Sequence, residues 1–473
     1  MRNSILSALV LQSLLAPAAQ GQASRGALAT GTYAITDVAV VPMTRDTVLR
    51  DATVLVRDGR IVAVGAARNI QVPAGAQRVD GRGKYLIPGL ADMHAHLYSD
   101  GDTPDSLARY ELGVMVANGV TATRFMIGTR EHFGLRREIE GGRIVGPQLW
   151  IASPQFTGKE DVNSRVVTTP EDARRAVKEM ADLGYDFIKL TLFISPAVYD
   201  AIVSEAKAQN IRVVGHVDPQ VGVARALAAG QQIEHLDNYL ESVLADSAPM
   251  KESVSDRGLF RLKYWESLDY VDDGKVERIA GATARSGTFT SPTLTVFKIA
   301  FGLGQSEQDV KARPDWAIMP AEMRALYLGA REKYWANPAT EARRMRWVQV
   351  RNRLVKAIAD SGGKIMTGSD TPEWFFGYGW TLHREMESLV AAGLTPYQAL
   401  AAATRTPAEF LRGTKEWGTI ETGKRADLLL LAADPLEDIR NTARIEGVSV
   451  GGRWLDAAER QRMIAAAVAR LGA

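Results

Sequence analysis

Residues 85–97 read YLIPGLADMHAHL, and the interpretation of the whole chain depends on this stretch. Its apolar first part predicts a β-strand over 85–94. Two of the chain's six histidines stand at the end of this strand, His94 as its last residue and His96 two positions later. Residues i and i+2 of a strand point to the same face, so both imidazoles should aim at one place. Taken alone, the pair fits a metal site and a pair of hydrogen-bonded core histidines equally well.

The middle of the chain alternates short apolar runs with helical patterns such as 170–183 and 196–209. This alternation is typical of βαβ units. The segments predicted as strands are 85–94, 119–126, 147–153, 185–192, 212–217, 232–237, 287–294 and 364–370. Eight strand–helix repeats predict an α/β fold, a (β/α)8 TIM barrel over 86–414, with its active site at the C-terminal ends of the strands.

Both ends of the chain carry a different pattern, rich in short alternating strands. Asp58-Gly59 marks a hairpin between β-branched runs, and Gly451-Gly452 marks a second turn near the other end. We therefore expect a small β-sandwich domain built from both terminal segments, 24–85 and 415–455. A C-terminal helix is expected over 456–473.

Composition narrows the classes of function. The formal net charge of the 473 residues is +2, which gives no electrostatic reason to expect nucleic acid as a partner. Arg2, the apolar run after it and a small-residue exit predict a cleaved signal peptide over 1–23. The expected location is secreted or periplasmic, without a stable membrane anchor after cleavage. Because the chain has no cysteine, any metal must be held by His, Asp, Glu, Lys or water.

Polar side chains stand at the ends of several predicted strands, each flanked by apolar residues. They are His94, His96, Lys189, His216, His235 and Asp370. Buried lysine and aspartate are costly unless they are paired or bound to a metal, so their convergence at one end of a barrel indicates a cationic centre. The alternative requires each of these residues to have its own hydrogen-bond partner.

The chain resembles the amidohydrolase superfamily, in particular its imidazolonepropionase-like and Xaa-Pro-dipeptidase-like branch. The motifs that carry the resemblance include YLIPGLADMHAHL, GVTATR, DFIKL, TGSDTP and GTIETGKRADLLLL. It implies that His94 and His96 bind one metal ion and that His216 and His235 bind a second. It further implies that Lys189, as N6-carboxylysine formed with CO2, bridges two divalent ions, most simply Zn²⁺. Asp370 would ligate the first metal and take a proton from the bridging hydroxide.

The same residue types fit this chemistry on general grounds. Neutral imidazoles and carboxylates bind Zn²⁺, and two ions about 3.5–4 Å apart acidify the water between them. An adjacent carboxylate then acts as general base. An unmodified ammonium would be repelled by the ions, so Lys189 must be neutral or a carbamate.

We therefore expect a metal-dependent amidohydrolase that cleaves an amide C–N bond, in a dipeptide or an N-acyl amino acid. The alternatives are a mononuclear cyclic-amide or lactone hydrolase and a non-catalytic barrel. Expected partners are a small-molecule substrate and, in a homo-oligomer, further copies of the chain, but not nucleic acid.

Weaker signals concern the residues around the predicted centre. By resemblance, Tyr239 would donate to an oxyanion and His383 would orient substrate near the barrel mouth, although core packing and a structural role fit them as well. Arg124 is expected in a structural ion pair, and His132 at the surface. Related dipeptidases carry a GGHG-like turn whose histidine helps to hold the substrate. This chain reads TGKEDVN there and has no histidine in that stretch, but Lys159 lies near the corresponding position and is able to pair with a substrate carboxylate.

The insert at 298–362 is longer than an ordinary barrel connection. Apolar residues at helical spacing, such as Met323, Leu326 and Tyr327, predict helices there. Because the insert leads into the strand that ends at Asp370, we expect a lid over the mouth. A peripheral helix pair or an oligomer contact is the alternative.

Overall fold

A computed structural model describes most of the chain beyond its N-terminal segment. The described residues are 29–97, 105–161, 163–249, 262–300, 303, 305–332, 338–372 and 377–472. The signal peptide expected at 1–23 lies outside the described residues.

All eight predicted strands are present and run parallel. The first sheet has the order β6 (Leu90–Ala95), β7 (Val120–Phe125) and β8 (Gln148–Ile151). The second sheet contains β11 (Phe187–Leu190), β12 (Arg212–Gly215), β13 (Gln232–Glu234), β14 (Phe289–Ser291) and β15 (Lys364–Ile365), in chain order. Two short strands that were not predicted, β9 (Gln155–Thr157) and β10 (Ser164–Val166), extend its edge beside β11.

Two parallel bridges connect these sheets at their ends. Ala152 pairs with Phe187 between β8 and β11, and Ala95 pairs with Thr371 between β6 and the segment after β15. The backbone N–H of Met93 also donates to the carbonyl of Thr367 at 3.0 Å. The strand order is therefore that of a TIM-barrel-like α/β fold. Because a bridge is shorter than a strand ladder, full closure of the barrel stays a prediction.

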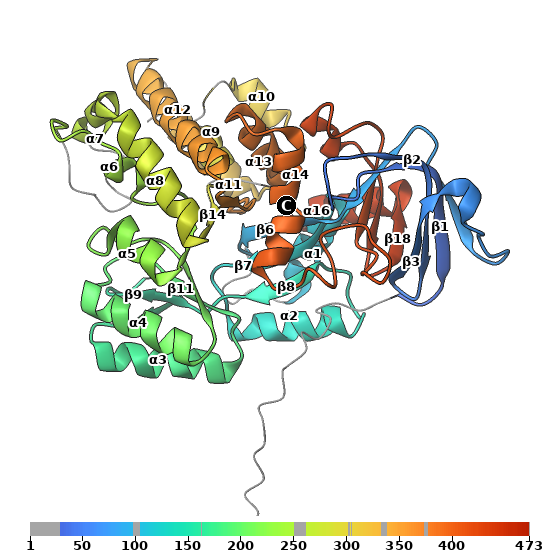
Figure 1. Cartoon of the computed structure of the whole chain (residues 1–473), viewed down its shortest axis with the longest axis horizontal. Helices are drawn as coiled ribbons and strands as arrows, with labels where there is room; N and C mark the ends of the chain where they lie inside the picture. The colour runs from blue at the N-terminus through green and yellow to red at the C-terminus, as the bar shows by residue number, and fades with distance from the viewer. Residues whose placement is uncertain are drawn as a thin grey trace, which may run out of the picture.

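Helices between the strands cover the outside of the sheets (Figure 1). They include α1 (Asp105–Ala117), α2 (Arg130–Glu140), α3 (Pro170–Leu183), α4 (Pro196–Ala208), α5 (Gly222–Ala229), α8 (Asp273–Ser286) and α13 (Trp380–Ala391). Helix α3 has the predicted bounds, and local chemistry explains them. The Thr169 hydroxyl accepts from the N–H of Asp172 at its start, and Gly184 adopts a left-handed conformation at its end.

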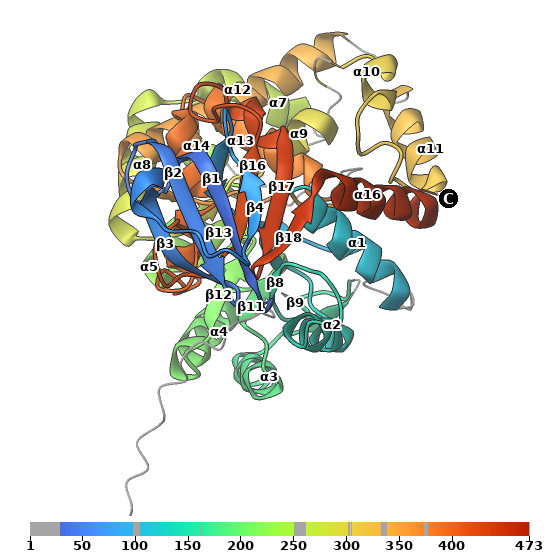
Figure 2. The same ribbon diagram turned by 90° about the vertical axis from the view of Figure 1, so that its right-hand side faces the viewer.

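The two ends of the chain share one eight-stranded sheet (Figure 2). The N-terminal part supplies β1 (Thr32–Val40), β2 (Leu49–Arg57), β3 (Arg60–Ala66), β4 (Gln77–Asp80) and β5 (Tyr85–Pro88). The C-terminal part supplies β16 (Leu428–Leu431), β17 (Ile445–Val450) and β18 (Arg453–Asp456). The ends meet where β5 pairs antiparallel with β16. Since all of these strands belong to one sheet, a sandwich of two sheets stays a prediction.

The strand predicted at 85–94 is wrong in one respect, because the structure divides it at Gly89. The part before this glycine is β5 of the terminal sheet, and the part after it is β6. A Cβ atom on Gly89 would lie 2.1 Å from the Thr121 hydroxyl oxygen, so the close packing at the crossing requires glycine.

The insert is helical where the structure describes it, as predicted. Helix α9 (Leu294–Ala300) leads into it, followed by α10 (Glu307–Lys311), α11 (Ala321–Ala330) and α12 (Pro338–Asp360). The predicted C-terminal helix is α16 (Ala457–Leu471), which lies along α1 (Figure 2). Shorter helices are α6 (Tyr239–Ser242), α7 (Leu262–Ser267), α14 (Pro396–Ala402) and α15 (Arg405–Phe410). None of the described helices combines the length and the apolar composition that crossing a bilayer requires.

Candidate metal centre

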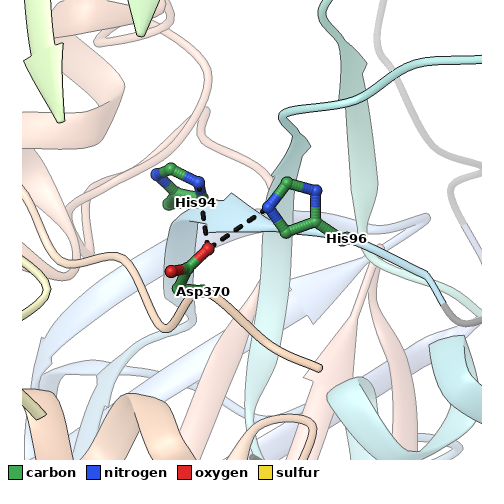
Figure 3. Close-up of side chains that lie close together, drawn as sticks. All are labelled: His94, His96 and Asp370. Atoms are coloured by element: carbon green, nitrogen blue, oxygen red, sulfur yellow. Dashed lines mark hydrogen bonds and ion pairs between the residues drawn. The ribbon is translucent and has the colours of Figure 1, made fainter. Parts of the chain in front are cut away.

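Three of the predicted residues meet at one point (Figure 3). His94 Nε2 lies 3.1 Å and His96 Nε2 3.2 Å from the same oxygen, Oδ1 of Asp370. The residues are only 1%, 6% and 7% exposed, respectively. Two imidazole nitrogens and a carboxylate oxygen within 4.8 Å of one another form a donor set that suits a divalent ion.

The backbone around Asp370 holds this arrangement in place. Asp370 follows β15 and has a φ of +55°, in the left-handed region. Its N–H donates to the His94 carbonyl at 2.7 Å. Gly368 permits this approach, because a Cβ atom there would lie 2.7 Å from the His94 Cβ. An uncommon backbone conformation fixed by its neighbours is often found at functional sites.

Electrostatics keep the aspartate ionised. Burial alone would raise the pKa of Asp370, but the neighbouring His94 and His96 outweigh it and hold the pKa well below its usual range. Burial would lower the pKa of His94, yet Glu234 and Asp370 together raise it. The cluster is therefore built around a charged carboxylate.

The other two predicted histidines lie beside this cluster. The ring of His235 is 4.7 Å from the ring of His94 and 4.9 Å from that of His216, between centroids. His216 Nδ1 contacts Asp237 Oδ2 at 2.7 Å, and His235 Nδ1 contacts Thr293 Oγ1 at 2.7 Å. With Nδ1 occupied in both rings, Nε2 is the nitrogen left for a metal. Burial lowers the pKa of His235 to about 3, so this ring is neutral and able to act as a ligand.

Lys189, on β11, is 1% exposed. Its Nζ has no hydrogen-bond partner among the described residues. Burial lowers the pKa of the amine, although Glu234 and Asp370 oppose this effect. An unpaired buried ammonium is so unfavourable that such a lysine indicates a neutral amine, a modified amine or an amine that binds a ligand.

Sequence reasoning missed two buried carboxylates at the centre. Glu234 Oε2 lies 2.7 Å from His94 Nδ1, and its Oε1 accepts from Arg124 at 2.5 Å. Asp92 accepts the N–H of Ser369 at 2.9 Å, and burial raises its pKa to about 6. Strand alternation could have found Asp92, because it lies two residues before His94 on β6 and residues at this spacing share a face. The ion pair expected for Arg124 is confirmed.

His383 does not lie where the sequence suggested. Its Nε2 donates to the Asn118 carbonyl at 2.9 Å, and its Nδ1 contacts the Thr442 hydroxyl at 2.9 Å. Asn118 precedes β7, so this histidine joins elements at the N-terminal end of the strands, opposite to the end that carries His94 and Asp370. The expectation of a residue at the mouth is wrong, and both ring nitrogens form hydrogen bonds within the fold.

Tyr239 and His132 are also engaged in structural contacts. The Tyr239 hydroxyl lies 2.8 Å from the Thr283 hydroxyl of α8, and the side chain is fully buried. The structure thus places this phenol in the core, and a role in oxyanion binding stays a prediction. His132, expected at the surface, is instead buried at the start of α2, where its Nδ1 accepts from the N–H of Thr129.

Comparison with known proteins agrees with this geometry. The model of the amidohydrolase family matches residues 85–455. The imidazolonepropionase of Ralstonia nicotianae is 46% identical over 241 residues, which are 50% of this chain and 58% of the relative. That of Mycolicibacterium smegmatis is 44% identical over 82 residues. Alignments with the first curated relatives span only 20% to 25% of those proteins.

Solved structures align over far more of the chain. A putative prolidase from Bifidobacterium longum has a TM-score of 0.65 and 26% identity, and the alignment covers 93% of this chain and 99% of the prolidase. A bottromycin amidohydrolase has a TM-score of 0.72 at 23% identity, covers 93% of each chain and shows likeness of fold alone. With the family match spanning most of the sequence, the chain belongs to the amidohydrolase superfamily, in its imidazolonepropionase- and dipeptidase-like branch.

Proposed function

We propose that this chain is a metal-dependent hydrolase that cleaves an amide C–N bond at the C-terminal end of a closed (β/α)8 barrel. The observation that carries the proposal is the convergence of His94 and His96 on one oxygen of Asp370. Membership of the amidohydrolase family supports the reaction class.

The donor atoms fit two divalent ions, most simply Zn²⁺. His94, His96 and Asp370 would hold one ion, and His216 and His235 would hold the second. The neutral ring of His235 and the buried Nζ of Lys189, which has no partner among the described residues, support this assignment. Nitrogen and carboxylate ligands are those that Zn²⁺ prefers in proteins without cysteine.

Lys189 would complete the site as a carbamate. A neutral amine adds to CO2 and releases one proton, which yields an anionic group with two oxygens. Burial favours the neutral amine, because it lowers the pKa of Lys189. The product would place negative charge between two cations in a region where an ammonium is unfavourable.

Bound ions would acidify a water molecule and polarise the scissile carbonyl. Proton transfer would then depend on the side chains of the protein, in particular on Asp370. Asp370 is ionised at neutral pH, since its pKa is held low, and is available to accept the proton of the attacking water. The protonated carboxyl would return that proton to the leaving nitrogen, which completes the cycle without a further acid.

The proposed substrate is a dipeptide or an N-acyl amino acid. Lys159 follows β9 and is exposed, with its Nζ 5.8 Å from the centre of the Phe193 ring. Phe193 follows β11 and is 50% exposed. Both therefore stand at the C-terminal edge of the strands, where an ammonium would attract a substrate carboxylate and the ring would contact an apolar group. The structural likeness to a putative prolidase supports a short peptide.

A substrate screen with controlled metal content tests the proposal. The full chain is loaded with zinc and bicarbonate and assayed against Xaa-Pro dipeptides and N-acyl amino acids, with lactones and cyclic amides as a parallel panel. We expect amide hydrolysis that is lost on chelation and restored by zinc. Amide hydrolysis that persists in metal-free protein would contradict the proposal, and turnover of the cyclic panel alone would favour the alternative.

A further inference from the structure

Glu234 lies at the centre of a fully buried network behind the metal centre. Its two oxygens have different partners, because Oε2 meets His94 Nδ1 at 2.7 Å and Oε1 meets Arg124 at 2.5 Å. Glu234 and Arg124 have no exposed surface. Three strands thus contribute one chain of contacts, β7 through Arg124, β13 through Glu234 and β6 through His94.

Arg124 is itself held on several sides. Its Nε donates to the carbonyl of Met93, next to His94, at 2.7 Å, and another nitrogen donates to Gln232 at 2.9 Å. Its guanidinium also lies 5.5 Å and 5.3 Å from the centres of the Phe187 and Phe410 rings. A guanidinium fixed in this way gives the carboxylate one orientation.

We propose that Glu234 is a positioning residue for His94, and that Arg124 in turn positions Glu234. Holding Nδ1 fixes the tautomer and the ring direction, so that Nε2 faces Asp370 Oδ1 at 3.1 Å. Hydrogen bonds of this kind behind a metal-binding imidazole typically contribute about 10–100-fold to metal affinity. The inference deepens the proposed function and rests on it. A merely structural ion pair would stabilise the fold without affecting metal binding.

If Glu234 alone were replaced by an uncharged residue, the buried guanidinium of Arg124 would lose its carboxylate partner and the fold would be destabilised. The test must avoid this effect. We therefore compare two double variants that share Arg124→Met. In the first, Glu234→Gln keeps an oxygen that accepts from His94 Nδ1–H. In the second, Glu234→Leu provides a side chain of similar size without a hydrogen-bond acceptor. Glu234→Asp provides a third variant that keeps a negative charge in the network but shortens the side chain by one methylene, so both carboxylate oxygens are drawn back from His94 and Arg124.

Zinc dissociation constants, measured by competition with a chelator, provide the readout. We expect Arg124→Met with Glu234→Leu to bind zinc about 10–100-fold more weakly than Arg124→Met with Glu234→Gln. Glu234→Asp should bind zinc more weakly than the parent while it folds normally. Asp427→Asn is the matched control, because Asp427 is a buried acid that pairs with Arg425 and directly precedes β16. It should lower thermal stability and leave zinc affinity unchanged.

The outcomes separate this inference from the proposed function. A parent chain that binds zinc tightly, with equal affinities in the two double variants and in Glu234→Asp, would overturn the positioning role alone. A parent chain that binds no zinc would overturn the proposed function and this inference together.

Discussion

In three of the four histidines at the centre, Nδ1 forms a hydrogen bond with a polar side chain. The partners are Glu234 for His94, Asp237 for His216 and Thr293 for His235. A ring held at one nitrogen presents the other in a fixed direction, which reduces the entropy lost on metal binding. At the residue scale, the site is thus arranged before any ligand arrives.

Asp370 is expected to act as the general base. Asp370→Asn keeps the size of the side chain but removes the proton acceptor, so kcat should fall by about 10²–10⁴-fold. Because this residue also belongs to the proposed ligand set, zinc content must be measured on the same samples. A metal-loaded variant with a kcat near that of the parent would contradict the assignment.

Lys189→Ala is expected to lose one metal ion and most of the activity, because the proposed carbamate would supply ligands to both ions. Acetate or formate should restore part of the activity by placing carboxylate oxygens in the vacated space. Lys275→Ala is a suitable control, since Lys275 Nζ already donates to the Leu244 carbonyl at 2.7 Å. Full zinc content and turnover in Lys189→Ala would show that the amine is not involved.

His383 should affect stability rather than turnover. Burial lowers its pKa from 6.5 to about 4, so the unfolded chain binds this proton more readily than the folded chain. Stability from this group is therefore lost as pH falls from about 6.5 towards 4, by about 2 kcal/mol at pH 5 relative to pH 7.5. In urea titrations, His383→Gln should remove that share of the pH dependence. A variant as acid-sensitive as the parent would refute this explanation.

At the scale of single elements, much of the structure follows from the sequence. The eight parallel strands and α3 are found because period, turn residues and caps act locally. The division at Gly89 is not predictable in this way, because β5 and β6 form one apolar run and only the distant β16 determines which part joins the terminal sheet. Glu234 was missed for a related reason, since its partners come from two other strands.

The insert supplies a contact to the segment that follows Asp370. Asp315 is buried, pairs with Arg313, and accepts the N–H of Gly377 at 2.9 Å. This places the insert against the chain seven residues after the proposed base. The position is consistent with a wall beside the mouth, and the lid function stays a prediction.

The Asp315 contact provides a direct test of the insert. Asp315→Ala combined with Arg313→Met should lower kcat, because the segment after Asp370 loses an anchor, while zinc content stays at the parent level. Glu307→Ala is the control within the same insert, since Glu307 forms an exposed pair with Lys311 on α10. Equal turnover in the double variant and this control would exclude a role of the insert in the site.

At the scale of the whole molecule, the terminal sheet and the metal centre are connected by one continuous segment of the chain, β5 followed by β6. The β5 strand pairs with β16 from the other end of the chain. It leads through Gly89 directly into β6, which carries His94 and is followed by His96. The site therefore depends on both chain ends being paired. Asp370 is connected to the same strand, because its backbone N–H donates a hydrogen bond to the His94 carbonyl.

The most direct test of the central claim is the metal content of the full chain after loading with zinc and bicarbonate, measured by elemental analysis alongside amide hydrolysis. The account predicts close to two zinc ions per chain and activity that rises with occupancy. A stoichiometry that stays at zero would contradict it, whether or not the chain hydrolyses amides. A stoichiometry that stays at one would overturn the binuclear site and favour the mononuclear alternative.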